Sequence, residues 1–313
     1  RDRFYPDGCQ FAGKIVADFY VQHEFWFAAV QLILAMLGMG STLTGKDFRD
    51  VVREPLAVSA GTLIQLLVVP VTAFLFLRFL GVGEGVAVGI ALIAAIPGGT
   101  VSNIFTFFAR GNSALSISIT AITTLACLVT TPLILSLLIS NYLPPDFTMP
   151  RGKIVNEIAL TLLLPLAMGM AYLYLYPRTA PILSKWSIRG SLLVILLIVL
   201  GSVMAGRLDV NAFGLNNILL VILFTLALAG MGYLVPRLLR LSRPDAAAIE
   251  FEVIVRNVNL GVLLKASIFP AAVAETAALG DMVLFSLLLY GGLQLMFGGL
   301  LISFHRRSQR SSS

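Results

Sequence analysis

Apolar residues fill most of the chain, in long segments separated by short polar turns. Nine segments are long enough to cross a bilayer as helices, since about 20 apolar residues span the hydrocarbon core. They cover residues 23–43, 55–79, 86–109, 113–138, 154–176, 187–205, 213–236, 246–268 and 282–304. The pattern predicts an all-α polytopic membrane protein with about nine transmembrane helices.

Two of these segments are interrupted by polar or helix-breaking residues. The third contains the run Pro97–Asn103, and the eighth contains the polar run Glu250–Asn259. Hydrocarbon offers no water to backbone groups, so a broken helix at that depth must line a cavity or be buried in protein. Transporters place such breaks at the substrate site. The sequence therefore predicts two broken helices that meet at a binding site.

The order of the segments suggests an inverted repeat, because each half of the chain has one interrupted segment. We expect a surface segment over 1–22, a first repeat over 23–140 and a proline-containing linker over 141–153. A second repeat over 154–305 and a cytoplasmic tail over 306–313 follow. Four segments precede the linker and five follow it, as a ten-helix ancestor without its first helix would have.

Composition agrees with a membrane location. Hydrophobic residues make up 58% of the chain and charged residues 12%, against about 25% charged in soluble domains. The net charge of +6 comes from cations near segment ends, so it indicates topology and not nucleic-acid binding. More Lys and Arg lie on one side, which predicts a multi-pass cell (inner) membrane protein with its N-terminus outside and its C-terminus in the cytoplasm.

Charged residues inside the eighth segment are candidates for function, since intramembrane charge is unfavourable. Glu252 lies near the centre of that segment, and Arg256 follows four residues later. On one helix the two would face each other and could pair; the plainer interpretation is a structural ion pair between helices. Lys265, nearer the segment end, is predicted to extend its ammonium group to the interface.

Oxygen-bearing side chains surround the first break. Ser102 and Asn103 follow it, and Ser116 and Thr120 share a face of the next segment. If Glu252 joins them, hydroxyl, amide and carboxylate oxygens form the ligand set that hard cations prefer. The alternative for Ser and Thr is a hydrogen bond to the backbone or to a neighbouring helix. The same alternative applies to Gln65, which lies mid-segment.

Three stretches resemble the bile acid:sodium symporter family, and the resemblance extends over roughly Phe25 to Phe304. The stretches are Ile96–Asn103, Ala109–Ser116 and Glu252–Asn257. The resemblance implies a panel domain, a core domain and two broken helices that cross in the core. It assigns residues 23–43 and 154–205 to the panel and residues 55–138 and 213–304 to the core.

The resemblance also implies site residues. A first sodium site maps onto Ser102, Asn103, Ser116, Thr120 and Glu252. A second sodium site, or its replacement, maps onto Gln65, Glu252, Val253, Val255 and Arg256. The substrate site maps onto Gly99, Thr100 and Asn257, where amides at helix N-termini favour an anion.

Arg256 departs from the family, which usually has Gln at this position. A sodium ion about 4 Å from a guanidinium, at an effective dielectric of about 20, would be repelled by about 4 kcal/mol. Arg256 could replace the second sodium, or it could bind the carboxylate of the substrate. We therefore expect one bound Na⁺, disfavour a second, and expect no organic cofactor.

These features predict a secondary active transporter that moves an organic anion, bile acid-like or a small carboxylate, with sodium by alternating access. The alternative is a sodium-independent or proton-coupled anion transporter in which Arg256 replaces the second sodium. An enzyme is disfavoured because the chain has no His-Glu-x-x-His and no Gly-x-Ser-x-Gly motif. The expected partners are the organic anion and the lipid bilayer; nucleic acid is not expected, and no oligomer is required.

Overall fold

The computed structural model describes residues 7–45, 55–143 and 147–310. Parts of four predicted regions lie outside the described residues: 1–6 of the surface segment, 46–54 of the first repeat, 144–146 of the linker and 311–313 of the tail. In the described residues the secondary structure is helical, apart from one isolated antiparallel bridge. The predicted all-α fold is therefore confirmed.

The helices follow one another with short connections. The first half contains α1 (Asp7–Gly40), α3 (Pro55–Leu63), η1 (Ile64–Val68), α4 (Val69–Phe79), α5 (Glu84–Ala95), α6 (Thr100–Phe108), α7 (Ser113–Ile139) and η2 (Ser140–Tyr142). The second half contains α8 (Arg151–Glu157), η3 (Ile158–Leu163), α9 (Leu164–Leu175), α10 (Ala180–Met204), α11 (Val210–Phe213), α12 (Leu215–Leu238), α13 (Arg243–Ile254), α14 (Val258–Ile268) and α15 (Ala274–Arg310).

Seven continuous helices in the described residues are long and apolar enough to cross a membrane. They are Lys14–Gly40, Pro55–Phe79, Ser113–Tyr142, Arg151–Leu175, Ala180–Met204, Leu215–Leu238 and Ala274–Arg307. The two remaining predicted segments are the broken pairs α5–α6 and α13–α14. A polytopic membrane protein is thus confirmed, whereas the number of crossings stays a prediction.

Helix α1 differs from the predicted boundaries. It runs from Asp7 to Gly40 without a break, so the described part of the predicted surface segment and the first predicted span form one helix. The charges at Lys14 and Asp18 end the apolar pattern, but neither residue interrupts helical hydrogen bonding. A charge therefore marked the edge of the apolar segment and not the end of the helix.

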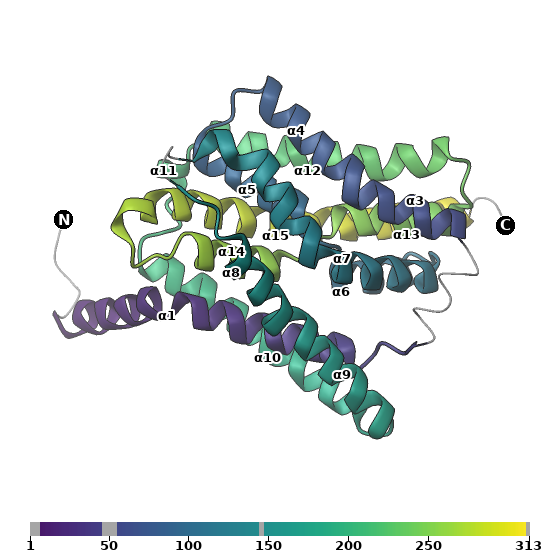
Figure 1. Cartoon of the computed structure of the whole chain (residues 1–313), viewed down its shortest axis with the longest axis horizontal. Coiled ribbons are helices and arrows are strands. Elements are labelled where there is room, and N and C mark those ends of the chain that lie inside the picture. Colours follow the sequence, from purple (N-terminus) through teal and green to yellow (C-terminus); the bar gives the residue numbers. More distant parts are fainter. Residues whose placement is uncertain (1–6, 46–54, 144–146, 311–313) are drawn as a thin grey trace.

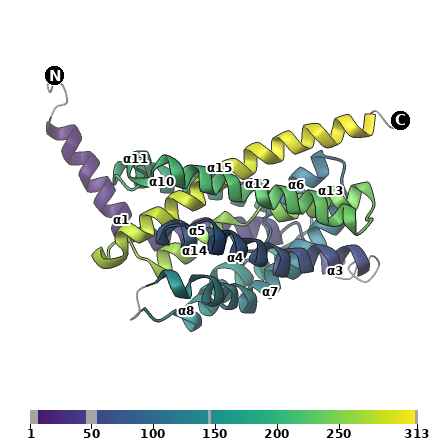
Figure 2. The same ribbon diagram turned by 90° about the horizontal axis from the view of Figure 1, so that it is seen from above.

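The helices form two groups (Figure 1). Helices α1, α9 and α10 lie together along the lower side of the view, and α3 to α7 and α12 to α15 occupy the upper part. From above, α1 and α15 run out at opposite ends of the molecule (Figure 2). The lower group contains elements predicted to form the panel, and the division into panel and core stays a prediction.

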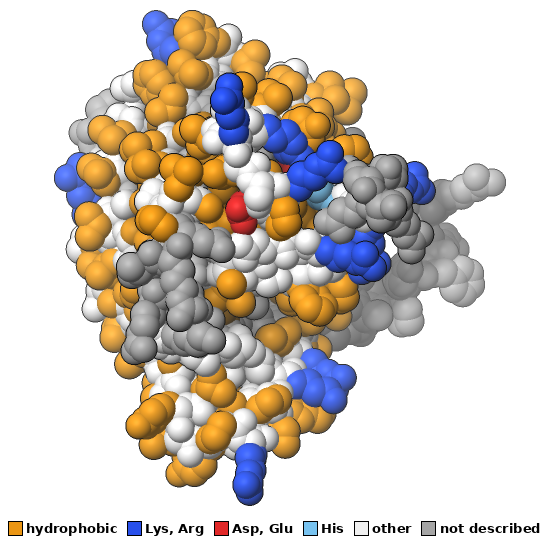
Figure 3. Space-filling model, turned by 90° about the vertical axis from the view of Figure 1, so that its right-hand side faces the viewer, with side chains coloured by type: hydrophobic (Ala, Val, Ile, Leu, Met, Phe, Trp, Pro, Cys, Tyr) orange, Lys and Arg blue, Asp and Glu red, His pale blue; other side chains and the backbone are white. Residues whose placement is uncertain are grey.

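The end of the molecule at the C-terminus carries Lys and Arg side chains at several places and shows little acidic surface (Figure 3). Apolar side chains are scattered between them over the described surface in this view. Basic residues near span ends are typical of the cytoplasmic side, and the orientation of the chain stays a prediction.

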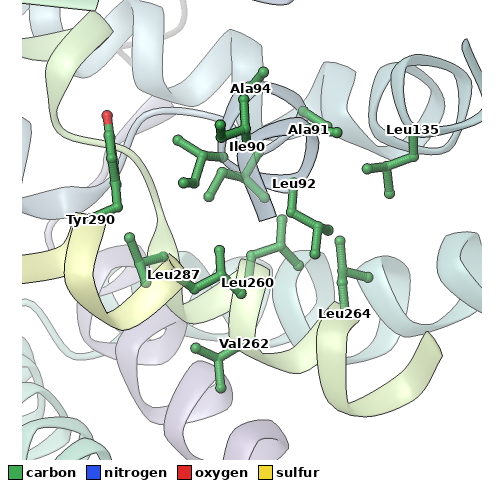
Figure 4. Packing of buried hydrophobic residues seen from close by; sticks show 14 of the residues in the cluster. Ile90, Ala91, Leu92, Ala94, Leu135, Leu260, Val262, Leu264, Leu287 and Tyr290 are labelled. Carbon is green, nitrogen blue, oxygen red and sulfur yellow. The ribbon is translucent and has the colours of Figure 1, made fainter. Parts of the chain in front are cut away.

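Helix α5 is the centre of the apolar interior. Every residue from Gly85 to Ala95 is buried, which is typical of a helix enclosed by protein on all sides. Its side chains meet those of α7, α14 and α15 (Figure 4). Gly85 and Gly89 face Met282 and Ser286 of α15 closely. The first broken helix is therefore held firmly up to the point where it ends.

Candidate functional site

The two broken helices cross at their breaks, as the sequence predicts. The N–H of Gly99 donates to the carbonyl of Val255 at 3.1 Å, and the N–H of Asn257 donates to the carbonyl of Pro97 at 2.9 Å. The two segments thus form the isolated antiparallel bridge. These bonds satisfy backbone groups that the breaks release, and they bring the start of α6 at Thr100 beside the start of α14.

Gly98 is required at the crossing because another side chain packs over it. A Cβ atom at this position would collide with the carboxylate of Glu252. The N–H of Gly98 donates to Oε1 of Gln65 at 3.0 Å. Gln65 lies in the π-helical turn η1, five residues before Pro70, and such turns are frequent at functional sites.

Glu252 is fully buried at 0% exposure and accepts hydrogen bonds from four neutral side chains. Oε1 accepts from the hydroxyls of Ser102, Ser116 at 2.7 Å and Thr120 at 2.8 Å. Oε2 accepts from Nε2 of Gln65 at 3.0 Å. Within the described residues the carboxylate forms no ion pair. Buried charges normally pair with an opposite charge or bind a metal ion.

Asn103 completes this cluster. Its Oδ1 lies 2.7 Å from the hydroxyl of Ser116 and 3.2 Å from that of Thr120. Each hydroxyl has one hydrogen, so neither can donate to Asn103 and to Glu252 at once. Oxygen lone pairs therefore face one another, an arrangement that a bound cation would relieve. The five residues predicted for the first sodium site (Ser102, Asn103, Ser116, Thr120 and Glu252), which we call the oxygen cluster, lie together, and their chemistry fits a hard cation.

Arg256 lies at the end of α5 and not beside Glu252. Its Nε donates to the carbonyl of Ile93 at 3.3 Å, and its Nη2 donates to the carbonyls of Ala94, at 3.3 Å, and Ile96. A cation is favoured there by the negative end of the helix dipole. The predicted ion pair with Glu252 is absent from the described residues, because α13 ends at Ile254 and helical spacing no longer applies at residue 256.

The residues predicted for the second sodium site connect through Gln65. Its Oε1 accepts from Nη1 of Arg256 at 3.0 Å, while its Nε2 donates to Glu252. The Val255 carbonyl accepts from Gly99, and Val253 is fully buried in the apolar interior. The oxygen of Gln65 and the end of α5 are thus already engaged by a guanidinium.

A cavity of about 440 Å³ lies between the crossing, α15, α1 and α10. Its lining includes the predicted substrate residues Gly99, Thr100 and Asn257. Across from them, Sδ of Met36 lies 4.0 Å from Nδ2 of Asn257. Amides at the first turn of a helix lack intrahelical partners, so the starts of α6 and α14 give this cavity a surface suited to an anion.

Sequence reasoning missed three polar residues at this place. Gln294 accepts from the backbone N–H of Arg256 at 2.9 Å, and it lines the cavity together with Gln31 and Ser191. Each interrupts an apolar segment. A polar side chain inside a spanning helix is a signal that could have found them.

A second group of buried charges joins α1 to α14 and α15. Lys265 is 0% exposed, so the prediction that it reaches the interface is wrong. Its Nζ lies 2.7 Å from Oε1 of Glu24, which also accepts from Nη1 of Arg207 at 2.8 Å. Nε of Arg207 contacts Asp281 at 2.5 Å. We refer to Glu24, Arg207, Lys265 and Asp281 as the charge cluster.

Known proteins resemble this chain along most of its length. YocS of Bacillus subtilis, named as an uncharacterized sodium-dependent transporter, is 32% identical over 81% of this chain and 78% of its own length. A probable sodium/metabolite cotransporter of Arabidopsis thaliana, BASS1, is 32% identical over 77% of this chain. The sodium-dependent organic anion transporter of rat is 28% identical over 97% of this chain and 79% of its own length.

The chain spans 59% of the length of the Arabidopsis protein. The sequence pattern of the Sodium Bile acid symporter family matches residues 29–205, a stretch that includes α5, α6 and α7 with four of the five residues of the oxygen cluster. Together with the similarity to the Bacillus protein, this match means that the chain belongs to the Sodium Bile acid symporter family.

Proposed function

We propose that this protein is a secondary active transporter that carries an organic anion together with sodium by alternating access. The observation that carries the proposal is the buried carboxylate of Glu252, which is surrounded by neutral oxygen and amide groups. A charge in this setting calls for a cation. Relatives described as sodium-dependent transporters support the same conclusion.

The sodium ion binds among Ser102, Asn103, Ser116, Thr120 and Glu252 in this proposal. These residues come from α6, α7 and α13, so a cation there holds both broken helices to α7. The anion binds in the neighbouring cavity at Gly99, Thr100 and Asn257. Sodium thereby stabilises the backbone arrangement that presents the helix N-termini to the anion, and the two ligands favour each other's binding.

Arg256 takes the place of a second sodium ion in this proposal. Its guanidinium occupies the oxygen of Gln65 and the carbonyls at the end of α5. The same observation favours the second candidate function, a sodium-independent or proton-coupled anion transporter. The guanidinium already supplies the positive charge that a second sodium ion would bring to this place. The oxygen cluster at Glu252, which Arg256 does not reach, favours the sodium-coupled function.

Thermal unfolding of the purified protein in sodium or potassium chloride tests the proposal, since a ligand that binds the folded state stabilises it. We expect sodium to raise the Tm of the parent protein. Thr120→Val removes one oxygen of the cluster with little change in shape, and it should weaken sodium binding about tenfold or more. Glu252→Ala should abolish the sodium effect.

The matched control is Thr123→Val, on the same helix. The hydroxyl of Thr123 donates only to carbonyls of its own helix, those of Ile119 and Thr120. This variant should keep the sodium response of the parent protein. An unchanged sodium response in Thr120→Val and Glu252→Ala would place the cation elsewhere, and no response in the parent protein would favour the sodium-independent candidate.

A further inference from the structure

One polar pair stands out on the wall of the cavity that faces the crossing. Gln31 of α1 donates from Nε2 to the hydroxyl of Ser191 of α10 at 2.9 Å. Both residues line the cavity, and both are at least nine-tenths buried, with 2% and 5% exposure. The pair connects two helices of the wall and holds the amide group of Gln31 in place.

The amide oxygen of Gln31 lacks a hydrogen-bond donor among the described residues. Oε1 of Gln31 has no hydrogen-bond partner in the described part of the chain. Buried polar groups are nearly always paired, so an unpaired one needs an explanation. The wall around it is apolar, with Ala35, Met36, Leu192 and Ile195 among its members. Neighbouring protein groups therefore provide nothing for this oxygen to bind.

We propose that Gln31, oriented by Ser191, determines specificity by binding a hydroxyl group of the transported anion. This inference rests on the proposed function, in which the charged group of the anion lies at Thr100 and Asn257. A hydroxyl suits the site because it can donate to the amide oxygen and can accept from the amide nitrogen. The remaining wall receives the apolar part of the same molecule.

The distance between Asn257, where the charged group of the anion is proposed to bind, and Gln31 narrows the class of substrates. Asn257 contacts Met36 of α1, and Gln31 precedes Met36 by five residues on that helix. At about 1.5 Å per residue, the Cα atom of Gln31 lies about 7.5 Å from that of Met36 along the α1 axis. The substrates assigned here are thus organic anions whose hydroxyl is remote from the carboxylate, and not 2-hydroxy acids.

Binding measurements on the full-length protein in saturating sodium test this inference. The probes are ω-hydroxyalkanoates of increasing chain length, each compared with the unsubstituted alkanoate of the same length. In the parent protein one range of lengths should bind more tightly with the hydroxyl than without it. Gln31→Leu should reduce this preference about three- to tenfold. Gln31→Leu removes an unpaired buried oxygen together with the hydrogen bond to Ser191, so its Tm should stay close to that of the parent.

Two serine variants make the test specific. Ser191→Ala releases the amide of Gln31 and should reduce the hydroxyl preference. Ser187→Ala changes a buried serine one turn earlier on α10 and should leave the preference unchanged.

A preference that survives in Gln31→Leu, or a parent protein that binds both members of every pair equally, would overturn the inference while leaving the proposed function intact. If Gln31→Leu bound the hydroxylated and the unsubstituted probe equally more weakly and had a lowered Tm, the role of Gln31 would be structural only. That result would also overturn the inference. A parent protein that binds no organic anion would overturn the proposed function itself.

Discussion

At the scale of single residues, Arg256 changes the electrostatics of the site most. Its guanidinium donates through three nitrogens to four protein oxygens, an arrangement that matches the planar, forked geometry of arginine. Spacing along the sequence placed it opposite Glu252. The structure places Gln65 between the two. The guanidinium therefore binds carbonyls at the end of α5, whereas the carboxylate accepts from hydroxyls of α6 and α7.

Replacing Arg256 tests its role as a substitute for sodium. Arg256→Gln removes the charge and supplies an amide oxygen, so we expect the number of bound sodium ions to rise from one to two. Isotope titration of the purified protein measures this number directly. Arg256→Lys is the control, because it keeps the charge while losing the fork, and it should still bind one ion.

Two sodium ions bound to the parent protein would contradict this role for Arg256. The same holds for an Arg256→Gln variant that folds with the Tm of the parent and still binds one ion.

At the scale of helices, the breaks and the oxygen-bearing residues around them were predictable, whereas pairings between distant helices were not. Pro97 lacks an N–H and Gly98 disfavours a helix, so the interruption of the third segment can be predicted from the residues at the break alone. The five residues of the oxygen cluster followed from the breaks and from the family resemblance. The partner of Lys265 did not, since Glu24 is 241 residues away. Pairings of this kind depend on which helices pack together, which a single sequence does not reveal.

Close packing of α5 against α15 gives a test at this scale. A Cβ atom at Gly89 would lie 2.6 Å from Cβ of Ser286, so Gly89→Ala should push the helices apart. We expect the free energy of unfolding to fall by about 1–3 kcal/mol. Gly230→Ala on α12 is the matched control, because a Cβ there meets nothing within 4 Å, and it should add about 0.5–1 kcal/mol through helix propensity.

Denaturant unfolding of both variants in the same detergent makes the comparison. Equal effects at residues 89 and 230 would mean that α5 and α15 separate without loss, contrary to their packing.

At the scale of the whole molecule, the charge cluster links α1 to α14 and α15, two helices that line the cavity. Glu24 on α1 binds Lys265 on α14 and Arg207, which in turn binds Asp281 on α15. Buried pairs of this kind add little stability compared with apolar packing, but losing one partner leaves an unpaired charge. The cluster therefore ties the predicted panel to the predicted core in the arrangement seen here.

Glu24→Gln should lower the free energy of unfolding by about 3–5 kcal/mol, because Lys265 is then buried without a counter-charge. Adding Lys265→Met to this variant removes the unpaired ammonium group and should restore much of the loss, since Arg207 keeps Asp281. Chemical unfolding of the parent, both single variants and the double variant completes a double-mutant cycle. Additive effects in that cycle would mean that the two side chains do not interact.

The crossing itself is joined by peptide groups, with the N–H groups of residues 99 and 257 bound to the carbonyls of residues 255 and 97. Peptide groups are the same whatever side chain is attached, apart from the missing N–H of proline. We therefore expect the main-chain joint itself to tolerate exchanges of the side chains at Thr100 and Asn257, the residues that we propose bind the anion. If the proposed function holds, the choice of anion can change through these two positions, while Gly98 and the main-chain joint remain as they are.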